Sequence, residues 1–384
     1  MPLRIAFITT DNRQPFKQYA DPVPWFGPAP EAVLEGMTRV PELEVHIVSC
    51  IQQPVQAPKK LADNLSFHSL LVPKLGWMRT GYQGCVRAVG RCLRDIQPDL
   101  VHGQGTEREC ALSAVFSGYP NVLTIHGNMV DIARLMRARP FSFHWLAARL
   151  ENLAFRRTAG VFCNSSYTQS IVGPRVKKTW LVPNALRPEF LSTPLRANRP
   201  AKCVLLHIGV VGDNKQQLKM LALARRLHTQ GLAFEIRFLG DAVAGDSYST
   251  QFLSEIAEAE RAGYARHLGR KGTRELIAHF DEAAALIHTP RAEAFGLVVA
   301  EALARNLKFF GLAVGGVPDI ASGVQGAELV PAEDWGSLEN RICEWIKGGW
   351  PTPANAAETM VSRYSPAVIA LRHLEIYREV LGRR

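Results

Sequence analysis

Short apolar segments recur along the chain, and stretches whose apolar residues follow helical spacing lie between them. Runs with little polar alternation are typical of strands that are covered on both faces of a parallel sheet. Such runs occur at 3–9, 43–48, 100–102, 121–125, 160–164, 179–183, 203–209, 234–240, 283–287 and 309–314. Because the strands alternate with helices, the pattern predicts an α/β protein.

Two series of these strands lie on either side of a stretch rich in proline and arginine, 194–200. A chain of 384 residues is too long for a single core of ordinary size. We therefore expect an N-terminal domain of residues 1–194 and a C-terminal domain of residues 201–365. Helical spacing is clearest at 31–40, 82–96, 275–284, 297–304 and 366–381.

The most informative stretch runs from 285 to 320, where a strand, a loop and the helical run 297–304 follow one another. The unpaired N–H groups of a helix that starts beyond a strand end suit an anion, above all a phosphate. Glu293 and Glu301 flank this start. Positions eight residues apart on a helix are separated by about 12 Å, whereas the two carboxyls of a glycosidase lie about 5–9.5 Å apart. The spacing favours two separate hydroxyl-binding tasks along an extended ligand such as a nucleotide sugar.

This segment resembles the signature of the family 4 retaining glycosyltransferases, a Glu-x7-Glu pattern with Phe-Gly-Leu inside it and a Gly-Gly-x-Pro turn after it. The resemblance implies that Glu293 holds the donor sugar and that Glu301 holds the ribose. It also implies that the backbone N–H groups near Phe295, Gly296 and Leu297 bind the diphosphate. An ordinary surface helix with two solvated glutamates is the alternative.

The same resemblance extends over nearly the whole chain and implies the GT-B fold. In that fold two Rossmann-like domains face each other across a cleft, and a C-terminal helix, here 366–384, crosses back to the first domain. His126, in the sequence TIHG, matches the family's strand-His-Gly element, which implies a place near the donor's sugar and β-phosphate. A hydrogen-bonded structural histidine is the alternative.

Lys215, in GVVGDNKQQ, has the spacing of the family's diphosphate-binding lysine, although it could also be a solvent-exposed lysine at a helix start. Val210 stands where the family has a second cation, an arginine. An ammonium group gives charge-assisted hydrogen bonds to a diphosphate, so we expect another cation to substitute for that arginine. The candidates for this substitution are Arg270, Lys271 and Arg291.

The proline-rich loop 15–30 occupies the position of the family's glycine-rich first loop, which approaches the donor phosphates and the acceptor. Only Gly27 matches that pattern, and Pro28, which has no backbone N–H, stands where a second glycine is usual. The loop is therefore either a phosphate contact through Gly27 or a stiffened surface segment.

The net charge of +10 is concentrated in one half of the chain. Residues 1–199 contain 24 Lys and Arg against 14 Asp and Glu, a difference of +10, whereas residues 200–384 contain 21 of each. This asymmetry predicts an anionic partner for the first half, such as lipid headgroups or a phosphorylated acceptor. Nucleic acid is not expected, because no recognised binding motif accompanies the charge.

An arginine-rich amphipathic stretch, 129–157, is the first place where such a partner would bind. Leu146, Leu150 and Leu153 share one helical face, so the stretch predicts either a core-facing helix or one that lies on an anionic membrane. Further basic residues that a lipid could contact are Lys74, Arg79, Arg87, Arg91 and Arg94.

Several other features bear on location and cofactors. No segment is apolar for the length of a membrane span, and the N-terminus predicts a first strand and not a signal peptide. The seven cysteines are odd in number and form no Cys-x-x-Cys pair, which argues for reduced thiols and against a zinc site. We expect a cytoplasmic protein, with peripheral contact to the cytoplasmic face of a membrane as a further hypothesis.

Together these observations predict a retaining transferase that moves a sugar from a UDP- or GDP-linked donor to an acceptor hydroxyl, without a metal or other cofactor. The acceptor would be a glycan, a lipid-linked sugar or a small molecule, as in glycan, glycolipid or polysaccharide synthesis. Two alternatives are a nucleotide-sugar epimerase or phosphorylase on the same fold, and a non-catalytic module that binds nucleotide sugars or lipids.

Overall fold

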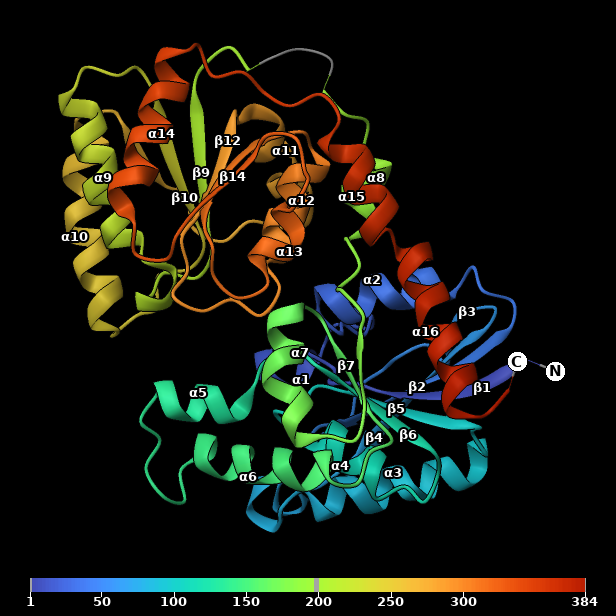
Figure 1. The fold of residues 1–384 in the computed structure, drawn as a ribbon. Helices are drawn as coiled ribbons and strands as arrows, with labels where there is room; N and C mark the ends of the chain where they lie inside the picture. Colours follow the sequence, from blue (N-terminus) through green and yellow to red (C-terminus); the bar gives the residue numbers. More distant parts are fainter. Residues whose placement is uncertain (1, 197–199, 384) are drawn as a thin grey trace. The chain divides into compact units, whose positions relative to one another are not determined.

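A computed structural model describes residues 2–196 and 200–383, and the chain divides into two compact units (Figure 1). Unit 1 comprises Met1–Arg187 and Pro366–Arg384, and unit 2 comprises Pro188–Ser365. Each unit is a layered α/β structure around a predominantly parallel sheet, which confirms the predicted fold class.

The sheet of unit 1 has the strand order β3-β4-β2-β1-β5-β6-β7-β8, and all neighbours are parallel except the β3–β4 pair. The strand order reverses between β1 and β5, which is where ligands bind in open parallel sheets. The strands are β1 (Leu3–Ile8), β2 (Leu43–Ile51), β3 (Lys60–Ala62), β4 (Leu65–Leu71), β5 (Leu100–Gln104), β6 (Asn121–Ile125), β7 (Val161–Cys163) and β8 (Thr179–Leu181).

Helices cover both faces of this sheet, as Figure 1 shows. In β1, Ile5 and Phe7 pack toward α2 and α16, while Ala6 and Ile8 pack toward α3, α4 and α6. Burial on both faces is why this strand has no polar alternation. The helices are α1 (Arg13–Phe16), α2 (Pro28–Met37), α3 (Gln83–Ile96), α4 (Glu109–Val115), α5 (Met129–Leu135), α6 (Phe143–Phe155), α7 (Ser166–Val172) and α16 (Pro366–Val380).

The C-terminal helix α16 belongs to unit 1, as the resemblance implied. It packs closely on α2, where a Cβ on Gly36 would lie 2.1 Å from the carbonyl oxygen of Pro366. Only glycine allows the two helices to approach this far. The contact places the last residues of the chain against the first α/β layer.

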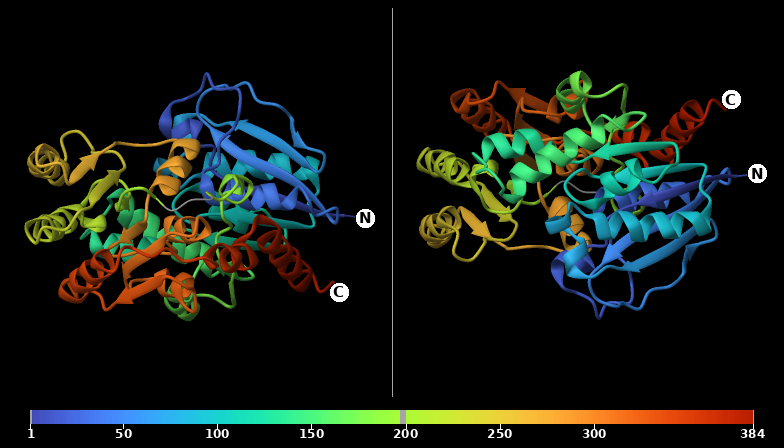
Figure 2. Two further views of the ribbon diagram at one scale, coloured as in Figure 1. Left: turned by 90° about the horizontal axis from the view of Figure 1, so that it is seen from above. Right: turned by 90° about the horizontal axis from the view of Figure 1, so that it is seen from below.

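The sheet of unit 2 has the order β11-β10-β9-β12-β13-β14, with every recorded pairing parallel, and its order reverses between β9 and β12. Helices α9, α10 and α14 lie on one side of it and α11, α12 and α13 on the other (Figure 1), and Figure 2 shows the layers from two further sides. The strands are β9 (Val204–Ile208), β10 (Glu235–Leu239), β11 (Ala265–His267), β12 (Ala285–His288), β13 (Lys308–Leu312) and β14 (Ala327–Val330). The helices are α8 (Pro188–Ser192), α9 (Gln217–Thr229), α10 (Ser247–Arg261), α11 (Thr273–Glu282), α12 (Leu297–Ala304), α13 (Val317–Ala321), α14 (Trp335–Lys347) and α15 (Ala356–Tyr364).

The boundary between the units precedes the predicted one, because α8 is part of unit 2. Phe190 of α8 packs edge-on against Phe280, with ring centroids 5.5 Å apart. The buried guanidinium of Arg305 donates to the carbonyl oxygens of Thr193 (2.6 Å) and Pro194 (2.7 Å) and pairs with Asp281. Of the predicted linker, 197–199 lie outside the described residues.

Two local predictions in unit 1 were wrong. The loop 15–30 is shorter than expected, since α2 begins at Pro28, and proline is well suited to the first helical position, where its missing N–H has no partner to lose. The leucine stripe of α6 is not its buried face, because Ala147, Glu151 and Ala154 are buried while Leu153 is 38% exposed. The side chain of Glu151 faces the interior, where the guanidinium of Arg175 pairs with it at 2.7 Å.

Candidate functional site

The polar residues of unit 2 that the sequence singled out gather where the strand order reverses. Lys215 follows β9 in a 3₁₀ turn, Asp213–Lys215, and Glu293 follows β12 in the loop before α12. Since β9 and β12 are adjacent parallel strands, their carboxyl ends bring both loops to one crevice. The fold therefore joins two residues that are 78 positions apart in the chain.

Glu293 is the centre of this group. Its Oε2 accepts from the ammonium of Lys215 at 2.6 Å and from Nε2 of His288 at 3.2 Å. The side chains of Lys215 and Glu293 are 23% and 18% exposed, so the pair is neither sealed nor freely solvated. A ligand can reach both groups.

The charges in this group follow from its surroundings. Burial would raise the pKa of Glu293, but the hydrogen bond from His288 and the charge of Lys215 outweigh it and lower the pKa to about 2. Burial and the nearby ammonium lower the pKa of His288, so its ring is neutral at pH 7 and donates from Nε2. Burial likewise lowers the pKa of His207, on β9, to about 3. One cation and one anion thus face the crevice.

Backbone contacts hold the two loops together. Asn214 donates to the carbonyl of Ala292 at 3.1 Å and accepts from its N–H at 3.0 Å. A Cβ on Gly209 would lie 3.0 Å from the side chain of Lys215, so glycine leaves room for this lysine to reach Glu293. At Gly315, φ is +57° and a Cβ would lie 1.7 Å from the carbonyl oxygen of Glu293. The Gly-Gly turn is therefore the support on which the Glu293 backbone rests.

Helix α12 begins beside Glu293. Its N-cap, Gly296, has φ +97° and supplies no side-chain cap, while Phe295 is buried and packs edge-on against Tyr364 at 5.6 Å. Leu297 and Val298, the first two helical residues, are partly exposed. The first N–H groups of a helix have no partner within it, and they carry its positive dipole end. The ammonium of Lys215 and this helix end are two positive groups for one anion.

The remaining predicted donor residues are distributed more widely. Glu301 is 2% exposed in the second turn of α12, and its role toward a ribose stays a prediction. Val210 is 58% exposed on the loop after β9. Among its proposed substitutes, Lys271 pairs with Glu275 at 3.7 Å and Arg291 with Asp213 at 3.0 Å. Arg270 follows β11 and is exposed.

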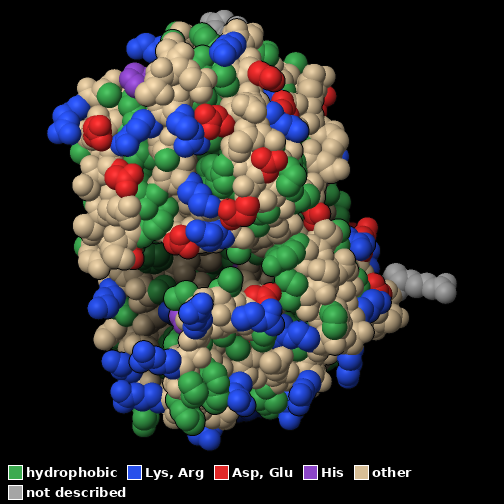
Figure 3. All heavy atoms as spheres, turned by 60° about the vertical axis from the view of Figure 1, so that its left-hand side comes forward, with side chains coloured by type: hydrophobic (Ala, Val, Ile, Leu, Met, Phe, Trp, Pro, Cys, Tyr) green, Lys and Arg blue, Asp and Glu red, His purple; other side chains and the backbone are tan. Residues whose placement is uncertain are grey.

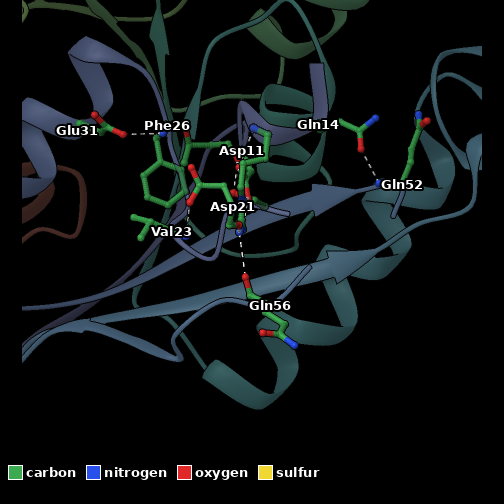
Figure 4. Close-up of polar contacts among 11 residues, drawn as sticks. Asp11, Gln14, Asp21, Val23, Phe26, Glu31, Gln52 and Gln56 are labelled. Atoms are coloured by element: carbon green, nitrogen blue, oxygen red, sulfur yellow. Dashed lines mark hydrogen bonds and ion pairs between the residues drawn. The ribbon is translucent and has the colours of Figure 1, made fainter. Parts of the chain in front are cut away.

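Figure 4 shows polar contacts of the loop after β1 in unit 1. This loop leads to Gly27, the N-cap of α2, which has φ +90°. A buried ion pair organises this loop: Arg13 binds Asp11 at 2.7 Å and donates to the carbonyl of Asp21 at 2.7 Å. The first three residues of α2 are Pro28, Ala29 and Pro30, and only Ala29 carries an N–H. The helix start beside Gly27 therefore offers few N–H groups to a phosphate, and its donor contact stays a prediction.

His126 follows β6 and is partly buried. Its Nε2 lies 3.2 Å from Oε1 of Gln104, which can only accept, so Nε2 carries the proton and Nδ1 is left as an acceptor. Burial lowers the pKa of His126 to about 4, so the ring is neutral at pH 7. The amide nitrogen of Gln104 hydrogen-bonds Nε2 of His102 at 3.0 Å. Nδ1 of His102 in turn hydrogen-bonds the hydroxyl of Tyr377 on α16 at 2.6 Å. This relay fixes the orientation of His126.

Sequence reasoning missed a carboxylate beside His126. Glu107 follows β5, and its Oε1 accepts from the N–H of Gly127 at 3.1 Å. A Cβ on Gly105 would lie 2.3 Å from its Oε2 and 3.7 Å from the ring of His126, which places Glu107 and His126 side by side. Burial raises the pKa of Glu107. Its position directly after a strand end was the available signal.

A second missed acid, Glu151 of α6, contacts the segments that carry Glu107 and His126. Its fully buried carboxylate pairs with Arg175 at 2.7 Å and accepts from the hydroxyl of Thr106 and the N–H of Met129, at 2.7 and 3.0 Å. Thr106 and Met129 lie on the two loops that carry Glu107 and His126. Glu151 therefore fixes both loops to α6.

Among residues 2–196 and 200–383, no group of three or more His, Cys, Asp or Glu is placed to hold a metal ion. In the same part of the chain, no helix combines the length and the hydropathy that a bilayer span requires.

Two family models match consecutive parts of the chain. The model described as "Glycosyl transferases group 1" matches residues 196–361, and "Glycosyltransferase Family 4" matches residues 37–190. No curated protein matches the chain.

Solved structures of similar fold cover nearly the whole chain. Sucrose-phosphate synthase from Thermosynechococcus elongatus has a TM-score of 0.76 at 16% identity, over 99% of each chain. Anabaena HepE, solved with UDP and glucose, has a TM-score of 0.71 at 16% identity, over 98% of this chain and all of its own. The lipopolysaccharide outer core galactosyltransferase WaaB has a TM-score of 0.69 at 14% identity, over 98% and 99%. These similarities show the GT-B fold.

Proposed function

We propose that the chain is a retaining and metal-independent glycosyltransferase, since the group 1 and family 4 glycosyltransferase models match residues 196–361 and 37–190. Its donor would be a nucleoside diphosphate sugar and its acceptor a hydroxyl of a glycan, a lipid-linked sugar or a small molecule. A UDP-linked sugar is the first donor to test, because HepE, of similar fold, was solved with UDP-glucose.

The observation that carries this proposal is the group Lys215, Glu293 and the start of α12 in one crevice. Without a ligand, the ammonium of Lys215 is bound to Glu293 at 2.6 Å. A diphosphate that binds at the helix start would replace Glu293 as the partner of the ammonium, since a phosphate accepts strong charge-assisted hydrogen bonds. Glu293, anionic because its pKa is about 2, would then be available to accept from hydroxyls of the donor sugar.

The reaction would proceed by exchange of two bonds at the anomeric carbon of the donor sugar. The bond to the β-phosphate oxygen breaks, and the acceptor oxygen bonds on the same face, which retains the configuration. The acceptor proton passes to the departing phosphate oxygen. Negative charge grows on the diphosphate during this step, and Lys215 with the N–H groups of α12 would stabilise it there.

His126 and Glu107 would bind sugar hydroxyls in unit 1. The unprotonated Nδ1 of His126 accepts a hydrogen bond, and burial keeps the ring neutral at pH 7. Glu107 offers a second acceptor beside it. Two convergent acceptors suit a polyhydroxylated ligand.

A non-catalytic module that binds nucleotide sugars is the second candidate, and the exposed Val210 in place of a second cation favours it. One experiment separates the two. A thermal-shift screen against UDP, GDP, ADP and their sugars identifies the donor, and release of the nucleoside diphosphate is then measured with and without an acceptor pool. Turnover supports the transferase; donor binding with neither transfer nor hydrolysis would support the module.

A further inference from the structure

The hairpin formed by α5, α6 and their connection exposes large apolar side chains at its tip. Phe141 is 80% exposed, Leu135 68%, Met136 63% and Phe143 46%. All four lie between 135 and 143. Monomeric soluble proteins rarely gather this many exposed large apolar residues in one place without a binding role.

The same tip is strongly basic. Arg134, Arg137, Arg139 and Arg149 are all exposed, and Asp131 is the one acidic residue in the sequence 129–149, which gives four positive charges against one negative. Figure 3, with the side that carries α5 and α6 turned forward, shows Lys and Arg side chains interleaved with hydrophobic ones over this part of unit 1. The patch is therefore apolar and cationic at once.

Aromatic contacts give the tip a definite shape. Phe141 lies against Trp145, with ring centroids 5.1 Å apart, and the guanidinium of Arg149 stacks over Trp145 at 4.0 Å. The backbone of Phe141 is in the left-handed region, with φ +64°, which is rare for a bulky residue. The fold holds this phenylalanine outward although its backbone conformation is unfavourable, which points to a use for it.

The base of the hairpin is rigid. Asn128 caps α5, its Oδ1 accepting from the N–H groups of Val130 and Asp131 at 3.1 Å each, and the buried Glu151 anchors α6 to Arg175. The exposed tip therefore projects from a fixed support.

We propose that this tip docks on an anionic lipid bilayer. Phe141, Phe143 and the aliphatic side chains beside them would enter the interface, where aromatic rings are favoured, while the arginines contact headgroup phosphates. A nucleic acid is a poorer match, because exposed Leu135 and Met136 provide no surface on which bases stack. The inference rests on the surface of unit 1 alone and stands apart from the proposed glycosyl transfer.

The test is co-sedimentation of the whole chain with vesicles of phosphatidylcholine alone, or of phosphatidylcholine and phosphatidylglycerol in equal parts. We expect binding to the anionic vesicles, weakened by high salt. The double variant Phe141→Ser with Arg139→Gln should bind at least about tenfold more weakly, since one arginine near such a surface contributes about fivefold in affinity and the lost ring adds to this.

The matched control is Leu253→Ser with Arg261→Gln on α10, where both residues are likewise exposed. It removes the same kinds of group from unit 2 and should bind as the unchanged protein does. Equal binding by the Phe141–Arg139 variant and the unchanged protein would overturn the proposal, as would binding that does not need the anionic lipid.

The emission of a Phe141→Trp variant, compared with that of the unchanged protein and its seven tryptophans, should show an added blue shift with anionic vesicles only. Displacement of the protein from the vesicles by single-stranded RNA, with an equal affinity for that RNA, would reassign the tip to nucleic acid. A failed vesicle test leaves donor turnover unaffected, so it is distinguishable from failure of the proposed function.

Discussion

Glu293 is the residue on which the proposed donor site depends, because it receives both the ammonium of Lys215 and the N–H of His288. Its low pKa keeps it an acceptor at any physiological pH. We expect Glu293→Gln to lower transfer about 100-fold or more with the fold retained, because a neutral amide cannot match a carboxylate toward the sugar hydroxyls in the transition state. Rates of nucleotide release check this.

The control for Glu293 is Glu258→Gln, which also breaks an ion pair in unit 2, the one to Arg225 at 3.1 Å, but on an exposed site. That variant should keep its rate. Unchanged turnover in Glu293→Gln would contradict the role given to this carboxylate.

Lys215 and Lys219 form a second matched pair, four positions apart and each bound to a glutamate. Lys215→Ala should weaken binding of the nucleoside diphosphate about tenfold to 100-fold, since a hydrogen bond to a charged group contributes about 1.5–3 kcal/mol. Lys219→Ala should leave it unchanged, because its ammonium is bound to Glu333 and not to Glu293. Titration calorimetry measures both, and equal losses in the two variants would argue against a specific diphosphate contact.

Glu109, at the start of α4, gives a prediction about stability. Both of its carboxyl oxygens are buried without a hydrogen-bond partner among the described residues, and burial raises its pKa to about 7. The folded-state pKa thus exceeds the ordinary value of 4.5. Its contribution to stability is therefore fully present below pH 4.5 and is lost as the pH rises through 7.

Glu109→Gln removes this titration. Between pH 4.5 and 8 the unchanged protein should lose on the order of 1–3 kcal/mol relative to the variant, measured as the free energy of unfolding in urea. Glu344→Gln, an exposed carboxylate on α14, is the control and should follow the unchanged protein. If the free energies of unfolding of Glu109→Gln and the unchanged protein changed with pH in parallel, the raised pKa of Glu109 would be refuted.

At the scale of elements, the turn between β13 and α13 supports the site. Gly315→Ala would force a Cβ to within 1.7 Å of the Glu293 carbonyl oxygen, so the loop before α12 must move. We expect a loss of stability of about 1–3 kcal/mol together with weaker donor binding. Gly231→Ala is the control, since its φ of +78° is also positive but nothing lies within 4 Å of the added Cβ. It should lose some stability and keep its donor affinity.

The elements were predictable to different degrees. Helix 297–304 and strand 121–125 have the predicted bounds, because each is a mostly apolar run with clear ends. Strand β4 was missed, since its residues alternate between buried and partly exposed at the side of the sheet near β3. The face of α6 was misjudged because a buried ion pair, Glu151–Arg175, replaces the apolar contact that the leucines suggested. Propensity cannot anticipate a partner 24 residues away.

The same limit applied to the site. The expected helix start and the family resemblance singled out Glu293, Lys215 and Gly296. They could not show that Lys215 is bound to Glu293, nor that Glu107 lies beside His126, since both depend on contacts across neighbouring loops. Which cation replaces the missing one at Val210 stays a prediction, because Lys271 and Arg291 are held in ion pairs with Glu275 and Asp213.

At the scale of the whole molecule, the two units follow one plan, a parallel sheet whose strand order reverses once. In unit 2 the reversal carries Lys215 and Glu293, and in unit 1 it carries Glu107, with His126 one strand further on. The positive charge, by contrast, lies almost wholly in residues 1–199. The sequence thus separates a neutral unit with the proposed donor site from a basic unit with the proposed membrane contact.

A crystal structure of the chain with its nucleoside diphosphate would test the proposed donor site. We expect the diphosphate at the start of α12, within hydrogen-bond distance of the Lys215 ammonium and of the N–H groups near Gly296 and Leu297. The carboxylate of Glu293 would be released from Lys215. A diphosphate bound elsewhere, with the Lys215–Glu293 pair intact, would contradict this expectation.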